Sequence, residues 1–370
     1  MISFEFNDVQ AMTQSAALKM AESIIRPLSK AQSAFRDVAY SKPLSSDFLN
    51  QLSSLGLVQS IATHDGGESA SSRLVSSLVL EQFAWGDANS ALAIAAPLGF
   101  VRAISEQGSA RQRAELLPSF TADAYQAAAI AAAEPGLISS GLKSIKTEIT
   151  RIDGGYVLNG RKALVPVAAR CSHFLVIARE GAELRAIIVP ARTPGVSIEP
   201  ARYTMGCASS EMSDVLFKDV RVGSDALLGE EKGCDIQRLA DGSWTAICAI
   251  LTGVSKSAYE FIVEYVKERK VGGVVLGTKQ AVAMKIVDMF ADSESMRWMG
   301  WRAANQLDSG GAEATKYARL AYGRAVDTAG WIVDECLQYM GGHGLMAEYP
   351  MESWFRNTKT LSTLETAIGV

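Results

Sequence analysis

The stretch that decides the fold is QYMGGHGLMAEYPMESWFRN, residues 338–357 of the 370-residue chain. It follows a segment of helical periodicity over 313–339, and the pair Gly341 and Gly342 is typical of a helix end. The stretch is therefore interpreted as a helix end.

Outward from this stretch, the chain divides into three parts by sequence texture. Residues 8–120 and the long segments 244–270 and 280–305 have helical periodicity, whereas 146–222 contain short β-branched runs. Turn signals such as Asp153-Gly154-Gly155 and Asn159-Gly160 separate these runs and favour antiparallel hairpins. We predict an α+β fold: a helical domain over 1–122, an antiparallel β-barrel-like domain over 123–228 and a four-helix bundle over 229–370.

Composition narrows the class of protein. Charged residues make up 21% of the chain and the formal net charge is -4, which argues against a sequence-independent nucleic-acid binder. No apolar run reaches the roughly 20 residues of a membrane span, and no signal peptide is visible. The 5 cysteines never form a CxxC pair, and the 3 histidines are far apart in sequence. We expect a cytoplasmic protein with no metal site, no nucleic-acid partner and no membrane partner.

Five motifs in one order along the chain carry a resemblance to a known family. They are residues 105–108 with 116–118, 134–136 with 145–147 and 155–162, 215–220 with 228–230, 269–280, and 338–357. Together they resemble the acyl-CoA dehydrogenase family, whose patterns include TEPGAGSD, YVLNGxK, RxxFGxPLxxxQ and QxxGGxGYxxEYPVERxYRDAR. The matches extend over nearly the whole chain, so the resemblance implies the family's three-domain fold.

The resemblance also implies a reaction and a base. Family members desaturate the α,β bond of an acyl thioester: a carboxylate takes the α-proton and FAD accepts a hydride. The stretch STLETA, residues 362–367, corresponds to the family's YEGT loop, so Glu365 is the candidate base. The expected substrate is an acyl-CoA or an acyl-carrier-protein thioester. An electron-transfer partner and a homodimer or homotetramer are also expected.

Several other residues occupy positions of the family's cofactor and substrate contacts. Arg269 and Gln280, with the glycine pair, correspond to residues that reach the dinucleotide of a neighbouring subunit. The complete set of expected cofactor contacts is Glu134, Ser139, Ser140, Leu164, Pro166, Arg269, Gln280, Gln338, Gly341, Gly342 and Thr366. Asp241 and Trp244 are the expected contacts of the acyl thioester.

Two stretches depart from the family pattern and keep other functions open. KALVPV, residues 162–167, stands where relatives have a WITN motif, and DGSW, residues 241–244, lacks the usual arginine. Pro166 offers neither a hydroxyl nor a backbone N–H to a flavin. The alternatives to a dehydrogenase are a subunit of a hetero-oligomer, a redox-inactive enzyme that uses Glu365 for proton transfer only, and a structural partner of an active homologue.

Overall fold

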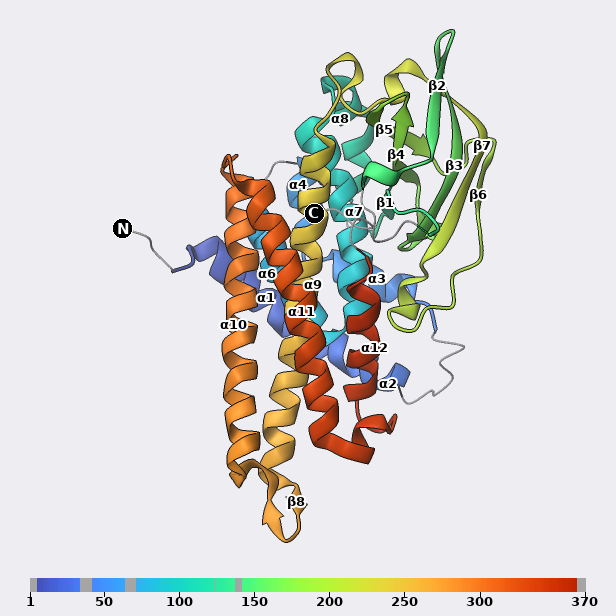
Figure 1. The fold of residues 1–370 in the computed structure, drawn as a ribbon. Coiled ribbons are helices and arrows are strands. Elements are labelled where there is room, and N and C mark those ends of the chain that lie inside the picture. The colour runs from blue at the N-terminus through green and yellow to red at the C-terminus, as the bar shows by residue number, and fades with distance from the viewer. Residues whose placement is uncertain (1–4, 34–41, 64–70, 123, 137–141, 365–370) are drawn as a thin grey trace.

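The computed structural model describes residues 5–33, 42–63, 71–122, 124–136 and 142–364 (Figure 1). The N-terminal part is helical, as predicted. Asp87 ends α6 and caps the next helix, α7, by accepting a hydrogen bond from the Ser90 N–H. The helices here are α1 (Asp8–Met20), α2 (Arg26–Ser33), α3 (Ser46–Ser53), α4 (Leu57–Thr63), α6 (Arg73–Gly86), α7 (Ala88–Gln107) and α8 (Ala110–Leu116), with a π-helical segment over Ala21–Ile25.

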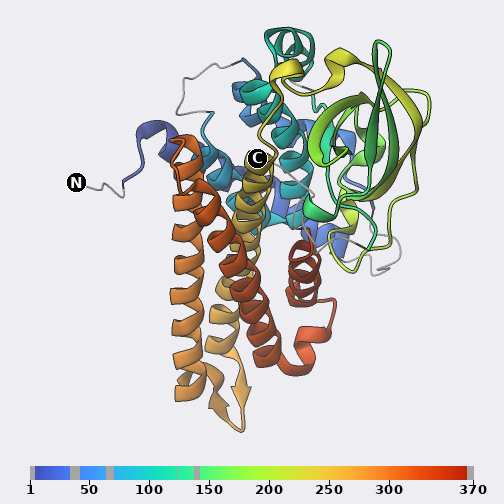
Figure 2. The ribbon, with the colours of Figure 1, turned by 45° about the horizontal axis from the view of Figure 1, so that its top comes forward.

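A curled β-sheet forms the middle domain and lies to one side of the helices (Figure 2). Its strands are β1 (Ala128–Ala131), β2 (Glu148–Ile152), β3 (Gly155–Val165), β4 (His173–Glu180), β5 (Glu183–Pro190), β6 (Val196–Ile198) and β7 (Ser213–Gly223). The order is β1-β4-β2-β3-β7-β6, and β5 pairs with β4.

The β2–β3, β3–β7, β4–β5 and β6–β7 pairings are antiparallel, as predicted, but β4 departs from the prediction by pairing in parallel with both β1 and β2. Ala128 of β1 stands opposite His173 of β4. The turn signals correctly indicated the β2–β3 hairpin, but β1 enters the sheet from the helical domain with no hairpin to fix its direction. A turn pattern predicts only the pairing of strands that are neighbours in sequence, so it does not indicate how β1 pairs with β4.

The C-terminal domain is a helical bundle whose long helices match the predicted segments closely. It consists of α9 (Ile236–Glu268), α10 (Gln280–Asp308), α11 (Ala314–Met340) and α12 (Met351–Leu361). Between α9 and α10 lies a small hairpin of β8 (Lys270–Val271) and β9 (Val274–Val275). Gly272 and Gly273 form its turn with positive φ values of 63° and 81°, which glycine adopts without strain.

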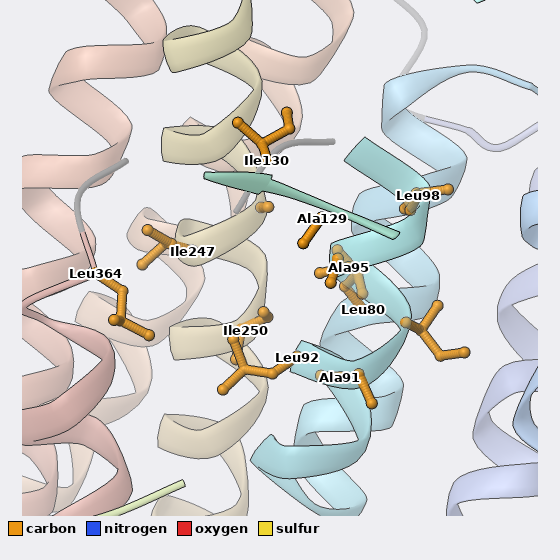
Figure 3. Close-up of a cluster of buried hydrophobic side chains, with 14 of the residues drawn as sticks. Leu80, Ala91, Leu92, Ala95, Leu98, Ala129, Ile130, Ile247, Ile250 and Leu364 are labelled. Carbon is orange, nitrogen blue, oxygen red and sulfur yellow. The ribbon is translucent and has the colours of Figure 1, made fainter. Parts of the chain in front are cut away.

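Helices α7 and α9 run through the core of the protein. By length and composition alone, both helices could cross a membrane. However, 94% of the most apolar window of α7 and 72% of that of α9 are buried inside the protein. Figure 3 shows side chains of α7, α9 and β1 in one cluster, among them Leu92, Ile130 and Ile247. Their hydropathy is thus explained by the core that joins all three domains.

Helix α9 approaches α6 closely at Gly253. A Cβ atom at Gly253 would lie 2.2 Å from the backbone oxygen of Glu81. Backbone cannot move aside as the end of a flexible side chain can, so this position requires glycine. The close approach keeps α6 and α9 packed along the middle of the molecule.

Gly253→Ala is therefore expected to lower the free energy of unfolding by about 3 kcal/mol, because the added methyl group overpacks the helix contact. Urea denaturation measures the change. Gly323→Ala in α11 is the control: a Cβ there meets nothing within 4 Å, so higher helix propensity should raise stability by about 1 kcal/mol. Equal stability of the two variants would contradict the packing argument.

Candidate functional site

The C-terminal segment enters the core immediately before the expected base. Leu364 is the last described residue and is only 1% exposed. Figure 3 shows it in the same cluster as Ile247 and Ile250 of α9. Glu365 and Thr366 lie outside the described residues. The residue that precedes the expected base is therefore fixed against α9.

Helix α12 holds this segment in place by docking on a loop of the middle domain. Three hydrogen bonds join them: Gly206 N–H to Thr360 Oγ1 (2.9 Å), Cys207 N–H to Asn357 Oδ1 (2.8 Å) and Arg356 Nη1 to Met205 O (2.7 Å). A Cβ atom at Gly206 would lie 2.4 Å from both the backbone C and O of Arg356. The loop and the helix are thus in backbone contact.

The end of β3, where the resemblance implies the flavin ring, is strained. Leu164 and Val167 have positive φ values of 54° and 48°, and the Val167 N–H donates to Ser210 O at 2.9 Å. A β-branched residue rarely adopts this conformation, and such strain often lies at functional sites. Leu164 is partly buried and Pro166 is buried between them. Ser139 and Ser140, two more of the expected cofactor contacts, lie outside the described residues.

Glu134, an expected cofactor contact, makes a buried ion pair inside the middle domain. Its carboxylate accepts hydrogen bonds from the N–H groups of Lys146 (2.8 Å) and Thr147 (2.9 Å) and from Lys162 Nζ (2.9 Å). Burial by itself would raise the pKa of Glu134, but the Lys162 charge and these bonds keep it below its ordinary value. Burial lowers the pKa of Lys162 to about 8. The observed role of Glu134 is to hold its loop on β3.

Asp241 and Trp244 lie near the start of α9, one turn apart. Asp241 is 2% exposed and its two oxygens accept hydrogen bonds from Gln237 (2.8 Å) and Thr315 (2.6 Å). Burial raises the pKa of Asp241. Its observed role is therefore to join α9 to α11, whereas Trp244 stacks on Tyr322 with ring centroids 6.3 Å apart.

The expected dinucleotide contacts gather at the other end of the bundle. Arg269 follows α9 directly, and Figure 1 shows the adjoining β8–β9 hairpin at the end of the bundle remote from the middle domain. Gln280 begins α10, and Gln338, Gly341 and Gly342 lie at the end of α11. All five residues are exposed. These five residues, called the phosphate-side residues below, thus lie at one end of the bundle, far from Leu164 and Pro166.

A cavity of about 430 Å³ beside Arg269 is lined by aromatic residues whose contacts with one another the sequence did not predict. His343 stacks on Tyr349 at 5.5 Å and its Nδ1 lies 2.9 Å from Tyr265 Oη. Phe261 and Tyr265, four residues apart on α9, also line the cavity. Their helical spacing was a signal that they share one face, but nothing local indicated that this face meets the glycine turn.

Three domain models of one known family match this chain, one for each of its three parts. The model of the acyl-CoA dehydrogenase N-terminal domain matches residues 7–123, that of the middle domain 129–220 and that of the C-terminal domain 237–366. The chain belongs to the acyl-CoA dehydrogenase family. It is thus an acyl-CoA dehydrogenase-like oxidoreductase, of the class that acts on CH–CH groups.

Individual relatives of this family member cover nearly the whole chain. Mitochondrial isobutyryl-CoA dehydrogenase of Dictyostelium discoideum is 28% identical over 368 residues, which are 98% of this chain and 86% of the relative. The structure of butyryl-CoA dehydrogenase from Megasphaera elsdenii matches with a TM-score of 0.87 at 25% identity, covering 98% of this chain and 96% of that chain. The structure of PigA with FAD and proline matches with a TM-score of 0.86 at 21% identity, covering 98% of this chain and 95% of that chain. At this identity the match shows similarity of fold.

Lys162→Met is expected to lower the free energy of unfolding by about 3–5 kcal/mol, because it leaves the Glu134 carboxylate buried without its cation. The control is Lys146→Met, the same change at an exposed side chain, which should alter stability by less than about 0.5 kcal/mol. Chemical denaturation monitored by circular dichroism gives both values. A Lys162→Met protein as stable as the wild type would show that the ion pair does not hold the loop.

Proposed function

We propose that this chain is an FAD-dependent acyl thioester dehydrogenase that desaturates the α,β bond of an acyl-CoA or acyl-carrier-protein substrate. Glu365 is the proposed α-proton base. The observation that carries the proposal is the position of Leu364, buried against α9 immediately before that carboxylate. The docking of α12 on residues 205–207 supports it, because a base must be held at one atom of the substrate.

In this mechanism the chain provides position. Leu364 is buried in the same core cluster as Ile247, which anchors the chain immediately before the proposed base. The strained turn from Leu164 to Val167 presents the surface on which the flavin ring is proposed to lie. FAD, when bound, supplies the hydride acceptor. The exposed glycine pair and Arg269 fit its phosphates, since a Cβ at either glycine meets nothing within 4 Å.

The two groups of proposed site residues support a shared site in a homodimer or homotetramer. Trp244 and Arg269 are separated by 25 residues along α9, which corresponds to about 37 Å at the rise of an α-helix. One FAD whose ring lay beside an acyl thioester at Trp244 and whose phosphates reached Arg269 would have to extend along most of this helix. We therefore propose that Arg269 and Gln280 serve the cofactor of a second copy. An electron-transfer partner would reoxidise the flavin, and the five free thiols favour a reducing, cytoplasmic setting.

A second candidate function is proton transfer without redox chemistry, as in an isomerase or a dehydratase. The observation that favours it is the buried Pro166, which has no N–H to donate beside the proposed ring. Both candidates require the Glu365 carboxylate. They differ in whether a bound flavin is reduced by an acyl thioester. A hetero-oligomer, in which a partner chain completes the flavin site, would show as a second subunit that co-purifies.

Glu365→Gln is expected to slow the anaerobic bleaching of the flavin band by an acyl-CoA at least about a hundredfold, because the α-proton then has no base. FAD binding should be unchanged. Glu231→Gln, the same change at an exposed carboxylate in the turn before α9, is the control and should keep the wild-type rate.

An unchanged rate in Glu365→Gln would reject this residue as the base. Wild-type protein that takes up FAD and is never bleached, yet exchanges the α-proton of the acyl-CoA with D₂O, would favour the second candidate. Protein that takes up no FAD would reject the dehydrogenase.

A further inference from the structure

Asn89 is a buried amide in the first turn of α7, and both ends of its side chain are hydrogen-bonded. It is only 8% exposed. Its Nδ2 donates to Asp87 Oδ1 at 3.1 Å, and its Oδ1 accepts the backbone N–H of Ser210 at 3.1 Å. Asp87 is itself fixed, because it also accepts the Ser90 N–H at 3.0 Å. Since the loss of either partner would leave a buried polar group unpaired, this amide holds α7 and the segment of Ser210 together.

Ser210, which Asn89 holds, lies between two parts of the proposed site. Its backbone oxygen accepts the N–H of Val167, the last residue of the strained turn at the end of β3. Its Oγ donates to the backbone oxygen of Cys207 at 2.6 Å. The Cys207 N–H donates in turn to Asn357 of α12. Ser210 therefore connects the turn proposed to face the flavin ring with the loop on which α12 docks.

Helix α7 is a rigid support for this contact. Leu92 follows Asn89 by three residues, and Figure 3 shows Leu92 in the same buried cluster as Ile250 of α9. A group that positions others must itself be fixed, and packing against a dense core provides this. The amide of Asn89 thus reaches Ser210 from a helix that the core holds in place.

We infer that Asn89 is a positioning residue of the dehydrogenase: through Ser210 it fixes the turn of residues 164–167 relative to the loop that docks α12. The flavin ring and the base are thereby placed relative to each other. The proton and the hydride leave neighbouring carbons of one substrate, so both groups have to be in place at the same time. This inference rests on the proposed function, because it needs the flavin at the turn and the base after Leu364.

Amide hydrogen exchange tests the first step of this inference without cofactor or substrate. Asn89→Leu removes both hydrogen-bonding groups and keeps a side chain of similar size. Peptides that contain Val167 should exchange faster in this variant, because Ser210 is no longer held. Ser72→Ala removes the side-chain cap of α6 and is the control for lowered stability. It should leave the exchange at Val167 as in the wild type.

Flavin reduction tests the second step. Of butyryl-CoA, isobutyryl-CoA and octanoyl-CoA, the one that bleaches the FAD-loaded wild type fastest is used. Asn89→Leu should bind this thioester as tightly as the wild type, but its flavin should be bleached at least about tenfold more slowly. The shape of its flavin absorption band should also change, since the surface under the ring moves. Ser72→Ala should keep the wild-type rate and band.

An exchange of the two side chains separates positioning from stability. Asn89→Asp puts two carboxylates at the 3.1 Å of the present bond, so it should be bleached as slowly as Asn89→Leu. The double variant Asp87→Asn/Asn89→Asp again pairs an amide with a carboxylate and keeps a capping residue for α7, so it should recover most of the wild-type rate. These two variants decide the question if Asn89→Leu does not fold.

Asn89→Leu with the exchange, rate and band of the wild type would overturn the inference while leaving the dehydrogenase intact. A double variant as slow as Asn89→Asp would do the same. A wild type that takes up no FAD, or that none of the three thioesters bleaches, would overturn the proposed function and the inference with it.

Discussion

The contact on which the site depends is the docking of α12 on the loop of residues 205–207. It joins the middle domain to the bundle through backbone and side-chain hydrogen bonds at a position where only glycine fits. Cys207 in this loop and Glu211, four residues after it, have positive φ values of 55° and 48°, so the backbone here is strained. Without this contact, α12 would retain its packing on α9 and α11 but lose its fixed position relative to the sheet.

From this contact the geometry of the site follows. Helix α12 ends at Leu361, and Leu364 then enters the core shared by α7, α9 and β1. The chain is thereby fixed immediately before the expected base, where Tyr322, which stacks on Trp244, donates its hydroxyl hydrogen bond to the Ser362 backbone oxygen. The phosphate-side residues lie at the remote end of the same bundle, so a complete site requires two copies in the proposed arrangement.

The fold could be predicted from the sequence because its elements are long and its motifs occur in order. The helix predicted over 313–339 is α11, Ala314–Met340. The direction of β1 could not be predicted, since its pairing with β4 depends on distant contacts. The hydrogen-bond partners of Glu134 and Asp241 could not be predicted for the same reason. Lys162 is 28 residues from Glu134, and Thr315 is 74 residues from Asp241. The roles of Glu365 and of the other expected site residues stay predictions.

The rate of flavin reduction in Gly206→Ala tests the central claim most directly. If docking of α12 positions the base, the variant should bind FAD as the wild type does, yet an acyl-CoA should bleach its flavin at least about tenfold more slowly. Gly330→Ala in α11, where a Cβ meets only Lys359 Nζ at 3.6 Å, should keep the wild-type rate. A Gly206→Ala protein that is bleached at the wild-type rate would contradict the account.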